Sequence, residues 1–365
     1  MRFRPRIPAA AENAPRFLGA VFFAFALLAT SACGKKGTPD WDTPGGNATT
    51  AAATIAPAAP EPAKPAPVPE EIEVAPEEPA EVQLPAKENA STEGLRFIAY
   101  NVENWLTMDR YVDGKNLKGA PKPESEKLAV VELLVRHAPD ILGLCEIGEA
   151  TDLAEIQERL KAAGLDLPHS HYTGGSDPTR HLGLLSRFPI VSTAKPAETE
   201  YQLAGQTFAI NRGILDATVA ARGKSYRFLG AHLKSKRDVE QADQEAIRLN
   251  EARLLRRHLD TILKADADAR VVVYGDLNDT RATPQIKTIT GKYNDPTYLT
   301  AIPAKDSRND AWTHHWALHD IYSRIDFIMV TRALRQDVDF PAAKIIDDVG
   351  WDKASDHRAI LAIFR

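Results

Sequence analysis

The sequence predicts a layered sandwich of the α/β (α+β) class, with sheets and helices packed as separate layers. Three observations favour this class. Segments typical of β-strands outnumber helical segments, several strand-like segments follow one another in pairs, and no internal repeat is visible. A regular alternation of strands and helices would place a helix between most successive strands, but the strand-like segments of this sequence are not separated in that way.

Nine short apolar or alternating segments are expected to form strands. They are Leu95 to Tyr100, Ile141 to Cys145, Leu182 to Ser186, Phe208 to Ile210, Ile214 to Val219, Tyr226 to His232, Val271 to Tyr274, Ile325 to Val330 and Ala359 to Phe364. Two segments have helical periodicity, 124–137 and 239–263. The first places Leu128, Val131 and Leu134 on one face. His258, in the second, follows two arginines and is expected to be solvated.

The N-terminus has the layout of an export signal. Residues 1–32 combine a basic start with an apolar run from Phe17 to Leu28 and then small residues. The run is shorter than the roughly 20 residues that span a bilayer as a helix. The junction Thr30-Ser31-Ala32-Cys33 resembles a bacterial lipoprotein processing site, which implies lipidation at Cys33 and a membrane-anchored location in the outer membrane, the periplasm or the cell surface. An ordinary signal peptide and an uncleaved anchor are the alternatives.

Residues 33–93 are expected to be a disordered tether. They hold eleven of the 25 prolines and almost no aromatic residues, so they cannot bury enough apolar surface to fold. The foldable part is then residues 94–365, a length that fits one large domain. Cys145, in the apolar run Ile141 to Cys145, is expected to be a small buried residue without a disulfide partner.

Charge divides in the same way. The net charge of −5 separates into +3 for residues 1–32, −7 for residues 33–93 and −1 for residues 94–365. A near-neutral domain lacks the broad basic surface of a tight, non-specific DNA-binding protein. Lys234, Lys236 and Arg237 follow one another closely, so a local basic rim is still expected.

Polar residues recur at or just after the ends of the expected strands, where a purely structural domain would not need them. They are Asn101, Glu146, His232, Asp276, Asn278, Asp326, Asp356 and His357. Taken singly, each has a plain structural explanation, because Asn101 or Glu146 can cap a turn or a helix and Asp276 to Asp279 can form a turn. Their combination is far more specific.

The combination resembles the endonuclease/exonuclease/phosphatase superfamily, to which deoxyribonuclease I and the apurinic endonucleases belong. The matching segments are YNVENW, PDILGLCEI, HLGLLSRFPI, INRGIL, GAHLKSK, VVYGDLND, SRIDFIMV and SDHRAI, in the family's order across residues 95–365. The resemblance implies a four-layer α/β/β/α sandwich with two mixed β-sheets, an active site at one edge of the sheets, and divalent-metal-dependent hydrolysis of phosphate esters.

The chemistry of phosphate esters gives these residues coherent roles. A phosphodiester is anionic, so an attacking hydroxide needs cations and hydrogen-bond donors nearby. Glu146 and Asp356 offer oxygen ligands for Mg²⁺, with Mn²⁺ or Ca²⁺ as alternatives, and Asn101 is a further ligand or a neighbour. Asp276 and Asn278 share one face if the segment is extended, so one can orient water while the other donates to a phosphoryl oxygen.

The family pattern adds further roles. It pairs Asp326 with His357 as a dyad that takes a proton or stabilises the pentavalent state. It leaves open whether Asp276 or His357 is the general base. His232 occupies the position of a second active-site histidine, which donates a proton to the leaving oxygen or contacts the phosphate. Arg212 matches a phosphate-contacting position, and a surface ion pair is the alternative for it.

The function expected from these features is a secreted or surface-tethered, metal-dependent phosphodiesterase, with nucleic acid as the expected substrate and no obligate protein partner. A phospholipid phosphodiesterase resembling sphingomyelinases is the first alternative, although no clear apolar hairpin for membrane entry is visible. An inositol polyphosphate phosphatase and an inactive phosphate-binding module are further alternatives. The rings of Trp312, His314, His315 and Trp316 can stack on a base or form an edge-of-core cluster.

Overall fold

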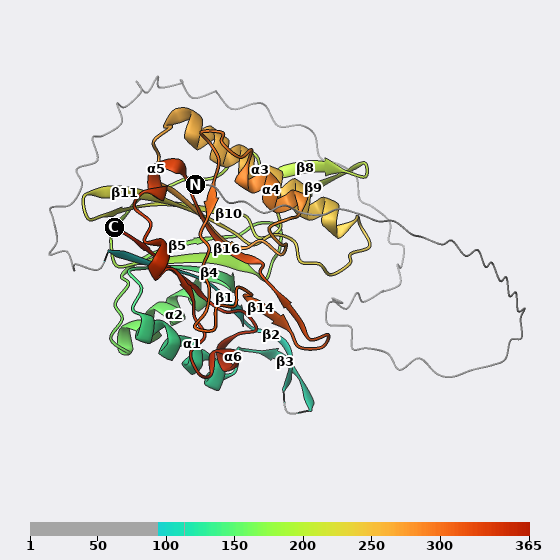
Figure 1. Cartoon of the computed structure of the whole chain (residues 1–365). Helices are drawn as coiled ribbons and strands as arrows, with labels where there is room; N and C mark the ends of the chain where they lie inside the picture. Colours follow the sequence, from blue (N-terminus) through green and yellow to red (C-terminus); the bar gives the residue numbers. More distant parts are fainter. Residues whose placement is uncertain (1–93, 113) are drawn as a thin grey trace, which may run out of the picture. The chain divides into compact units, whose positions relative to one another are not determined.

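The computed structural model describes residues 94–112 and 114–365 (Figure 1). The export signal at 1–32, the lipidation site at Cys33 and the tether at 33–93 lie outside the described residues, so these three expectations stay predictions. None of the helices in the described part of the chain is both long enough and apolar enough to span a membrane.

The first sheet has six strands in the order β17-β18-β1-β4-β6-β5. These strands are β17 (Lys344–Ile345), β18 (Ile360–Phe364), β1 (Leu95–Trp105), β4 (Ile141–Ile147), β6 (His181–Ser186) and β5 (His169–Thr173). The pair β1 and β4 is parallel, whereas the other neighbours are antiparallel, so the sheet is mixed.

The second sheet also has six strands, in the order β13-β16-β12-β11-β10-β7. They are β13 (Thr300–Ala301), β16 (Asp326–Val330), β12 (Val271–Asp276), β11 (Lys224–Ala231), β10 (Ile214–Ala221) and β7 (Ile190–Thr193). Here β11 and β12 form the parallel pair, and the remaining pairs are antiparallel.

The two sheets pack face to face, and helices cover their outer faces (Figure 1). One apolar cluster joins residues of both sheets, among them Phe97, Phe228 and Tyr274. A second cluster joins the first sheet to α1 (Glu124–His137) and α2 (Ala150–Ala162). A third joins the second sheet to α3 (Gln244–Ala265) and α4 (Pro284–Thr290). The predicted four-layer α/β/β/α sandwich with two mixed sheets is therefore confirmed.

Tyr274 fixes how closely the two sheets approach. Its ring packs edge-on against Phe97 of the opposite sheet, with 5.1 Å between the ring centroids. A Cβ at Gly143 would lie 2.2 Å from this ring, and one at Gly230 would lie 2.6 Å from its hydroxyl oxygen. Both positions therefore require glycine. Cys145 is buried in the same layer as a free thiol, as expected from the sequence.

The smaller elements lie outside the two sheets. They are the hairpins β2 (Met108–Val112) with β3 (Lys115–Ala120), β8 (Glu200–Leu203) with β9 (Gln206–Ala209), and β14 (His314–Trp316) with β15 (Ile321–Ser323), together with the short helices α5 (Arg332–Arg335), α6 (Trp351–Ala354) and η1 (Phe340–Ala342). None of the three hairpins was predicted as a pair of strands. The segment Phe208 to Ile210, expected as a strand by itself, forms part of β9.

Two helix predictions need correction. The second helix begins at Gln244 and not at Val239, because Asp243 caps it by accepting a hydrogen bond from the Ala246 backbone N–H at 2.7 Å. Leu128, expected on the buried face of α1, is half-exposed. The buried face of α1 instead runs through Val130, Leu133 and Leu134.

His258 is not solvated as the sequence suggested. Its Nε2 lies 2.7 Å from Oδ2 of Asp216, a buried residue of β10. Arg227 of β11 donates to both oxygens of the same carboxylate, at 2.8 and 2.6 Å. This trio fastens α3 to the second sheet.

The trio predicts loss of stability in acid. Burial by itself would raise the pKa of Asp216, but the hydrogen bonds from His258 and Arg227 hold it below its ordinary value. A depressed pKa stabilises the fold above the unfolded-state pKa of about 3.9, and this contribution is lost as the pH falls through the lower folded-state value. Asp216→Asn should cost roughly 2 kcal/mol at pH 7, since Arg227 is partly exposed. Urea unfolding between pH 7 and 3 measures this; equal stability of both proteins at pH 7 would contradict it.

Candidate active site

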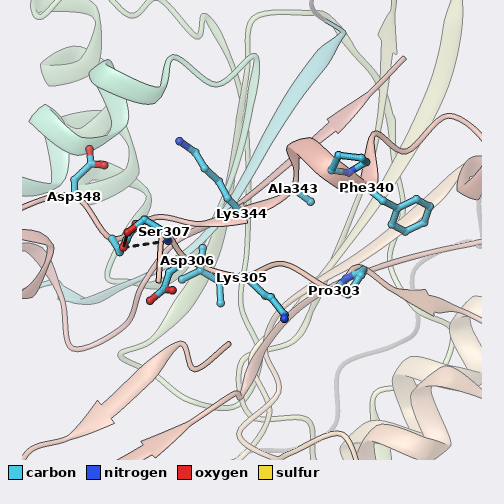
Figure 2. Close-up of a pocket in the computed structure, with 11 residues that line it drawn as sticks. Pro303, Lys305, Asp306, Ser307, Phe340, Ala343, Lys344 and Asp348 are labelled. Atoms are coloured by element: carbon cyan, nitrogen blue, oxygen red, sulfur yellow. Dashed lines mark hydrogen bonds between the residues drawn. The ribbon is translucent and has the colours of Figure 1, made fainter. Parts of the chain in front are cut away.

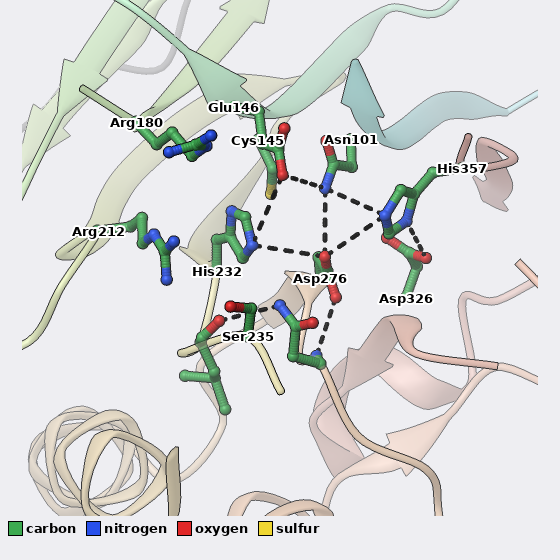
Figure 3. Close-up of polar contacts among 12 residues, drawn as sticks. Asn101, Cys145, Glu146, Arg180, Arg212, His232, Ser235, Asp276, Asp326 and His357 are labelled. Atoms are coloured by element: carbon green, nitrogen blue, oxygen red, sulfur yellow. Dashed lines mark hydrogen bonds and ion pairs between the residues drawn. The ribbon is translucent and has the colours of Figure 1, made fainter. Parts of the chain in front are cut away.

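Polar ends of three strands meet at one edge of the first sheet. Because β1 and β4 are parallel, with Asn101 opposite Cys145, Asn101 and Glu146 emerge at the same end. β18 begins at Ile360 and runs antiparallel to β1, which brings His357 to this end as well. Residues that are far apart in the sequence therefore converge, as Figure 3 shows.

The second sheet supplies the facing half of the site from the same edge. His232 directly follows β11, and Asp276 ends β12, the parallel neighbour of β11. Asp326 is the first residue of β16 and lies opposite Asp276 in the antiparallel pair of β12 and β16. Gly275 makes this arrangement possible. Its φ is 128°, and a Cβ there would lie 2.0 Å from the carbonyl oxygen of Ala231.

Asp276 lies at the centre of the site (Figure 3). Its Oδ2 is 3.7 Å from Nε2 of His357 and 3.5 Å from Nε2 of His232. Nδ1 of His357 donates to Oδ2 of Asp326 at 2.8 Å, which forms the His–Asp dyad that the family pattern implies. All four side chains are buried. Asp276 and the dyad therefore form one contiguous acid–base group.

The electrostatics of this group suit proton transfer near neutral pH. Burial and the nearby Asp326 raise the pKa of Asp276 to about 7, although His357 partly opposes this. Burial disfavours the charged form of His357, yet Asp326 and Asp276 raise its pKa well above the ordinary value. A carboxylate and an imidazole in contact, both with a raised pKa, can hold and exchange a proton.

Asn101 is oriented as a hydrogen-bond donor towards the acidic residues of the site. Its Oδ1 accepts a hydrogen bond from the backbone N–H of Glu103 at 3.1 Å, which fixes the direction of the amide. Its Nδ2 then donates to Glu146 Oε1 and to Asp276 Oδ2, both at 3.2 Å. Of the two roles expected for Asn101, the structure favours that of a neighbour, which holds Glu146 and Asp276 in place.

Glu103 joins the site although the sequence analysis did not select it. Its Oε2 accepts from the Asp356 backbone N–H at 3.1 Å. Burial, followed by the charge of Asp356, raises the pKa of Glu103 to about 7, and Glu146 adds to this effect. Glu103 follows Asn101 at the same two-residue spacing that separates Asp276 from Asn278, and this spacing is the signal in the sequence that could have found it.

The acidic residues suit a hard divalent cation. Glu103, Glu146 and Asp356 bring carboxylates of like charge near one another, and a cation with oxygen ligands would relieve their repulsion. Among the described residues, the predicted ligands do not form one compact set. Asp356 clusters with His314 and His357. Glu146 instead accepts hydrogen bonds from Asn101 and from the Asn104 backbone N–H. The charges of Asp356 and Glu146 both raise the pKa of Glu103, so Glu103 interacts electrostatically with both predicted ligands.

Backbone strain is concentrated at the site. Left-handed φ values between 48° and 65° occur at four of its non-glycine residues, which are Glu103, Asn104, Glu146 and Asn278. Such conformations are costly for L-residues and persist where the surrounding structure enforces them. In β1 the strain accompanies an irregularity of the register after Asn101, which turns the carboxyl end of the strand into the site.

Asn278 departs from the extended geometry expected of it. Its backbone N–H donates to Asp276 Oδ1 at 2.9 Å, so the two residues form a tight turn and do not share one face of a strand. Its side-chain Nδ2 donates to the carbonyl oxygen of Leu233 at 3.0 Å. Asn278 therefore fixes the segment after His232, and its second amide N–H is the donor available to a substrate.

His232 is held in its neutral form. Burial is the main cause of a pKa well below the ordinary value, and the charges of Arg212 and His357 add to it. Its Nδ1 is buried without a hydrogen-bond partner. The N–H of a neutral imidazole can contact a phosphate oxygen or lie next to the leaving oxygen, so both roles expected for His232 stay predictions.

Two arginines lie beyond His232, on the side away from His357 (Figure 3). Arg212 is buried, and its Nε lies 3.2 Å from Asp177 Oδ2, but Nε and Nη1 have no hydrogen-bond partner. Arg180, which the sequence analysis missed, anchors its Nε on Asn104 Oδ1 at 2.9 Å. The surface ion pair considered for Arg212 does not describe this buried position.

A buried carboxylate orders the backbone around these arginines. Glu251 of α3 accepts hydrogen bonds from the backbone N–H groups of Asn211 and Lys234. Asn211 directly precedes Arg212, and Lys234 lies two residues after His232. Lys234 is not part of an exposed basic rim as expected, because it is buried and its Nζ donates to the carbonyl oxygen of Arg237 at 2.9 Å. Lys236 is exposed and lies 3.5 Å from Asp279.

A separate pocket lies apart from these residues (Figure 2). It has a volume of about 540 Å³ and is lined by residues of the segments 303–307 and 340–348. Ser307 donates to Asp347 Oδ2 at its rim. None of the clustered acid–base residues lines it, so the chemistry belongs to the sheet edge and not to this pocket.

Comparison with solved structures supports the same fold. The endonuclease/exonuclease/phosphatase from Bacteroides vulgatus is 18% identical, with a TM-score of 0.53 over 74% of this chain and 98% of that chain. The human Nocturnin catalytic domain with bound sulfate anion is 17% identical, with a TM-score of 0.53 over 74% and 94%. Sphingomyelinase C from Streptomyces griseocarneus is 14% identical, with a TM-score of 0.51 over 75% and 100%. At these identities the similarity shows the fold alone.

No curated protein matches the sequence. The sequence profile described as Endonuclease/Exonuclease/phosphatase family matches residues 115–357, which is more than half of the chain. The matched range contains Glu146, His232, Asp276, Asp326 and His357. The chain therefore belongs to the endonuclease/exonuclease/phosphatase family, whose members are metal-dependent phosphoric ester hydrolases.

Proposed function

We propose that this protein hydrolyses phosphodiester bonds of nucleic acids with the help of a divalent cation, most simply Mg²⁺. The observation that carries the proposal is the convergence of Asp276 with the His357–Asp326 dyad, near the carboxylates of Glu103, Glu146 and Asp356, whose charges act on one another. An acid–base group next to a cation site is what in-line attack of water on a phosphodiester requires.

The residues of this chain divide the work between them. Asp276 and His357 orient the attacking water and take its proton, and Asp326 holds the imidazole through Nδ1. Glu146, Glu103 and Asp356 would hold the cation, which withdraws charge from the phosphoryl oxygens when bound. Asn101 keeps Glu146 and Asp276 in register by donating to both.

Nucleic acid fits the charge distribution around the centre. Arg180 and Arg212 lie on one side of Asp276, and the donors of Arg212 are not saturated by the protein. A guanidinium can bind two oxygens of one phosphate, and a polynucleotide carries further phosphates beside the one that is cleaved. A zwitterionic headgroup such as phosphocholine would place a cation near these arginines.

One observation favours a second candidate, hydrolysis of phospholipids. The sequence showed no clear apolar hairpin for membrane entry, but the β14–β15 hairpin exposes Trp316, Leu318, Ile321 and Tyr322. This corrects the earlier expectation. These exposed side chains are candidates for contact with either substrate.

A substrate panel tests the proposal. The purified full-length protein would be offered single-stranded and duplex DNA, RNA, inositol phosphates and sphingomyelin vesicles, each with Mg²⁺. We expect cleavage of nucleic acid and little turnover of the other substrates. Hydrolysis of sphingomyelin with no cleavage of DNA or RNA would refute the proposal and establish the second candidate.

We further propose that the protein is exported and anchored to a membrane by lipid at Cys33. The apolar run from Phe17 to Leu28 and the small residues before Cys33 support this location. Cys33→Ser should move the protein from the membrane fraction to the soluble fraction. Membrane association that survives this change would point to an uncleaved anchor.

A further inference from the structure

The β14–β15 hairpin is the most concentrated exposed apolar feature of the described residues. Four of the nine large hydrophobic side chains that are exposed there belong to it: Trp316, Leu318, Ile321 and Tyr322, with exposed fractions of 48, 80, 46 and 51%. We call residues 312–323 the aromatic hairpin, because half of its twelve residues carry rings. Exposed patches of this kind mark binding surfaces.

The aromatic hairpin is tied directly to the catalytic residues. His314 forms a β-bridge with His357, and the centroids of their rings lie 4.6 Å apart. The backbone N–H of His315 donates to the Asp356 carbonyl oxygen at 3.2 Å. Thr313 Oγ1 accepts from the backbone N–H of Asp326 at 3.1 Å. A ligand on the hairpin is therefore held beside the dyad.

The rings of the aromatic hairpin are held by one another. His315 and Tyr322 stack with 4.1 Å between centroids and 7° between planes. The ring of Trp312 packs edge-on against Tyr322 at 4.8 Å. Trp316 packs against His319 at 4.1 Å. Tyr322 and Trp316 are half-exposed despite these contacts, so each offers a prearranged surface for a flat partner at little cost in side-chain entropy.

The polar groups of the aromatic hairpin argue against burial in a lipid layer. Its tip, Leu318-His319-Asp320, has two polar residues out of three, and the side chain of Asp320 is 82% exposed. Entry into hydrocarbon would require this carboxylate and two histidines to lose water. The hairpin also lacks lysine and arginine, which attract interfacial helices and loops to anionic lipids.

We propose that the aromatic hairpin is a stacking platform for an unpaired nucleobase beside the cleaved phosphate, so that the substrate class is single-stranded nucleic acid. This inference rests on the proposed function and makes it more specific. Arg180 and Arg212 bind phosphate on the far side of Asp276. The ring of Trp316, which shares a face of the hairpin with His314, binds a base on the near side of His357, whereas Tyr322 pairs with His315 on the opposite face. Base stacking on aromatic rings is tolerant of sequence and needs a base whose face is free.

The test distinguishes recognition of the bases from recognition of the phosphates. Two DNA strands of equal length would be compared, one with normal bases and one with abasic tetrahydrofuran residues, together with the matching duplex and sphingomyelin vesicles. With the full-length protein, we expect kcat/KM for the base-bearing strand to exceed that for the abasic strand by about 10-fold. Trp316→Ala should bring this ratio towards one, whereas Tyr322→Ala, on the opposite face of the hairpin, should retain it.

Matched variants control for general damage. Tyr293→Ala removes a tyrosine that is 74% exposed on the loop after α4, and it should leave both rates unchanged. Leu318→Ser removes an aliphatic contact without a ring, so cleavage of nucleic acid should persist. Thermal unfolding of each variant checks that the fold is intact.

Three outcomes would overturn the inference. The ratio can stay near 10-fold in Trp316→Ala, the duplex can be cut as fast as the single strand, or vesicles can be hydrolysed with a loss in Leu318→Ser that shows lipid contact. In the first two cases nucleic acid is still cleaved, so the proposed function stands and only the platform fails. Absence of cleavage of any nucleic acid refutes the proposed function itself.

Discussion

Replacing His357 by alanine is expected to lower kcat by about 1000-fold while the protein stays folded. His357 contacts both Asp276 and Asp326, so the variant removes the imidazole that moves or holds a proton at the centre of the site. Asp326→Asn should be milder, at about 100-fold, because the imidazole remains but loses the carboxylate that orients Nδ1. Steady-state rates on a single-stranded DNA substrate measure both effects.

The matched control for His357 is His169→Ala. His169 lies on β5 and pairs with Ser186 at the end of the sheet remote from the site, so its removal should leave kcat unchanged. Circular dichroism and thermal unfolding would show whether either variant loses structure. Full activity of His357→Ala would mean that the acid–base group has been assigned wrongly.

Removing the divalent cation is the second change for which we expect a large effect. Chelation should lower the rate by about 1000-fold, since a cation contributes several kcal/mol of charge stabilisation to the transition state. Glu146→Gln should have a comparable effect at low Mg²⁺, because it removes one of the carboxylates that would hold the ion. Activity should return in part as the Mg²⁺ concentration is raised.

Binding of the cation can be measured without activity. An ion that binds only the folded protein raises the unfolding temperature by mass action, so Mg²⁺ should stabilise the native protein and stabilise Glu146→Gln less. Glu158→Gln, at an exposed position on α2, is the matched control and should behave as the native protein does. Turnover that is indifferent to chelator would exclude the metal-dependent mechanism.

Much of the fold was predictable because its strands are buried and continuous. Eight of the nine expected strands form parts of the two large sheets, since a strand covered on both faces consists of a short apolar run. The helix α2 and the three small hairpins were missed. They are partly exposed or mixed in polarity, and what fixes them is contact with the sheets and not a pattern of their own.

The candidate site was predictable for a related reason. Glu146, His232, Asp276 and Asp326 sit at or just beyond strand ends, and Asn101 follows the apolar run of β1 where the register becomes irregular, so a local pattern marks them. The parallel pair of β1 and β4 brings Asn101 and Glu146 to one edge of the first sheet, and the parallel pair of β11 and β12 brings His232 and Asp276 to one edge of the second. The packing of the two sheets then places these edges together. His357 reaches the same edge because β18 runs antiparallel to β1.

The sequence by itself determined the fold class and predicted which residues form the candidate acid–base group, because strand patterns and strand-end polar groups are local properties. Only the tertiary structure decided how those groups are used. The left-handed turn at Glu103 brings a further carboxylate to the site and directs the nitrogen of Asn101 at Glu146. Arg180 and the aromatic hairpin belong to segments far away in the chain, and no local pattern can reveal that folding places them beside Asp276 and His357.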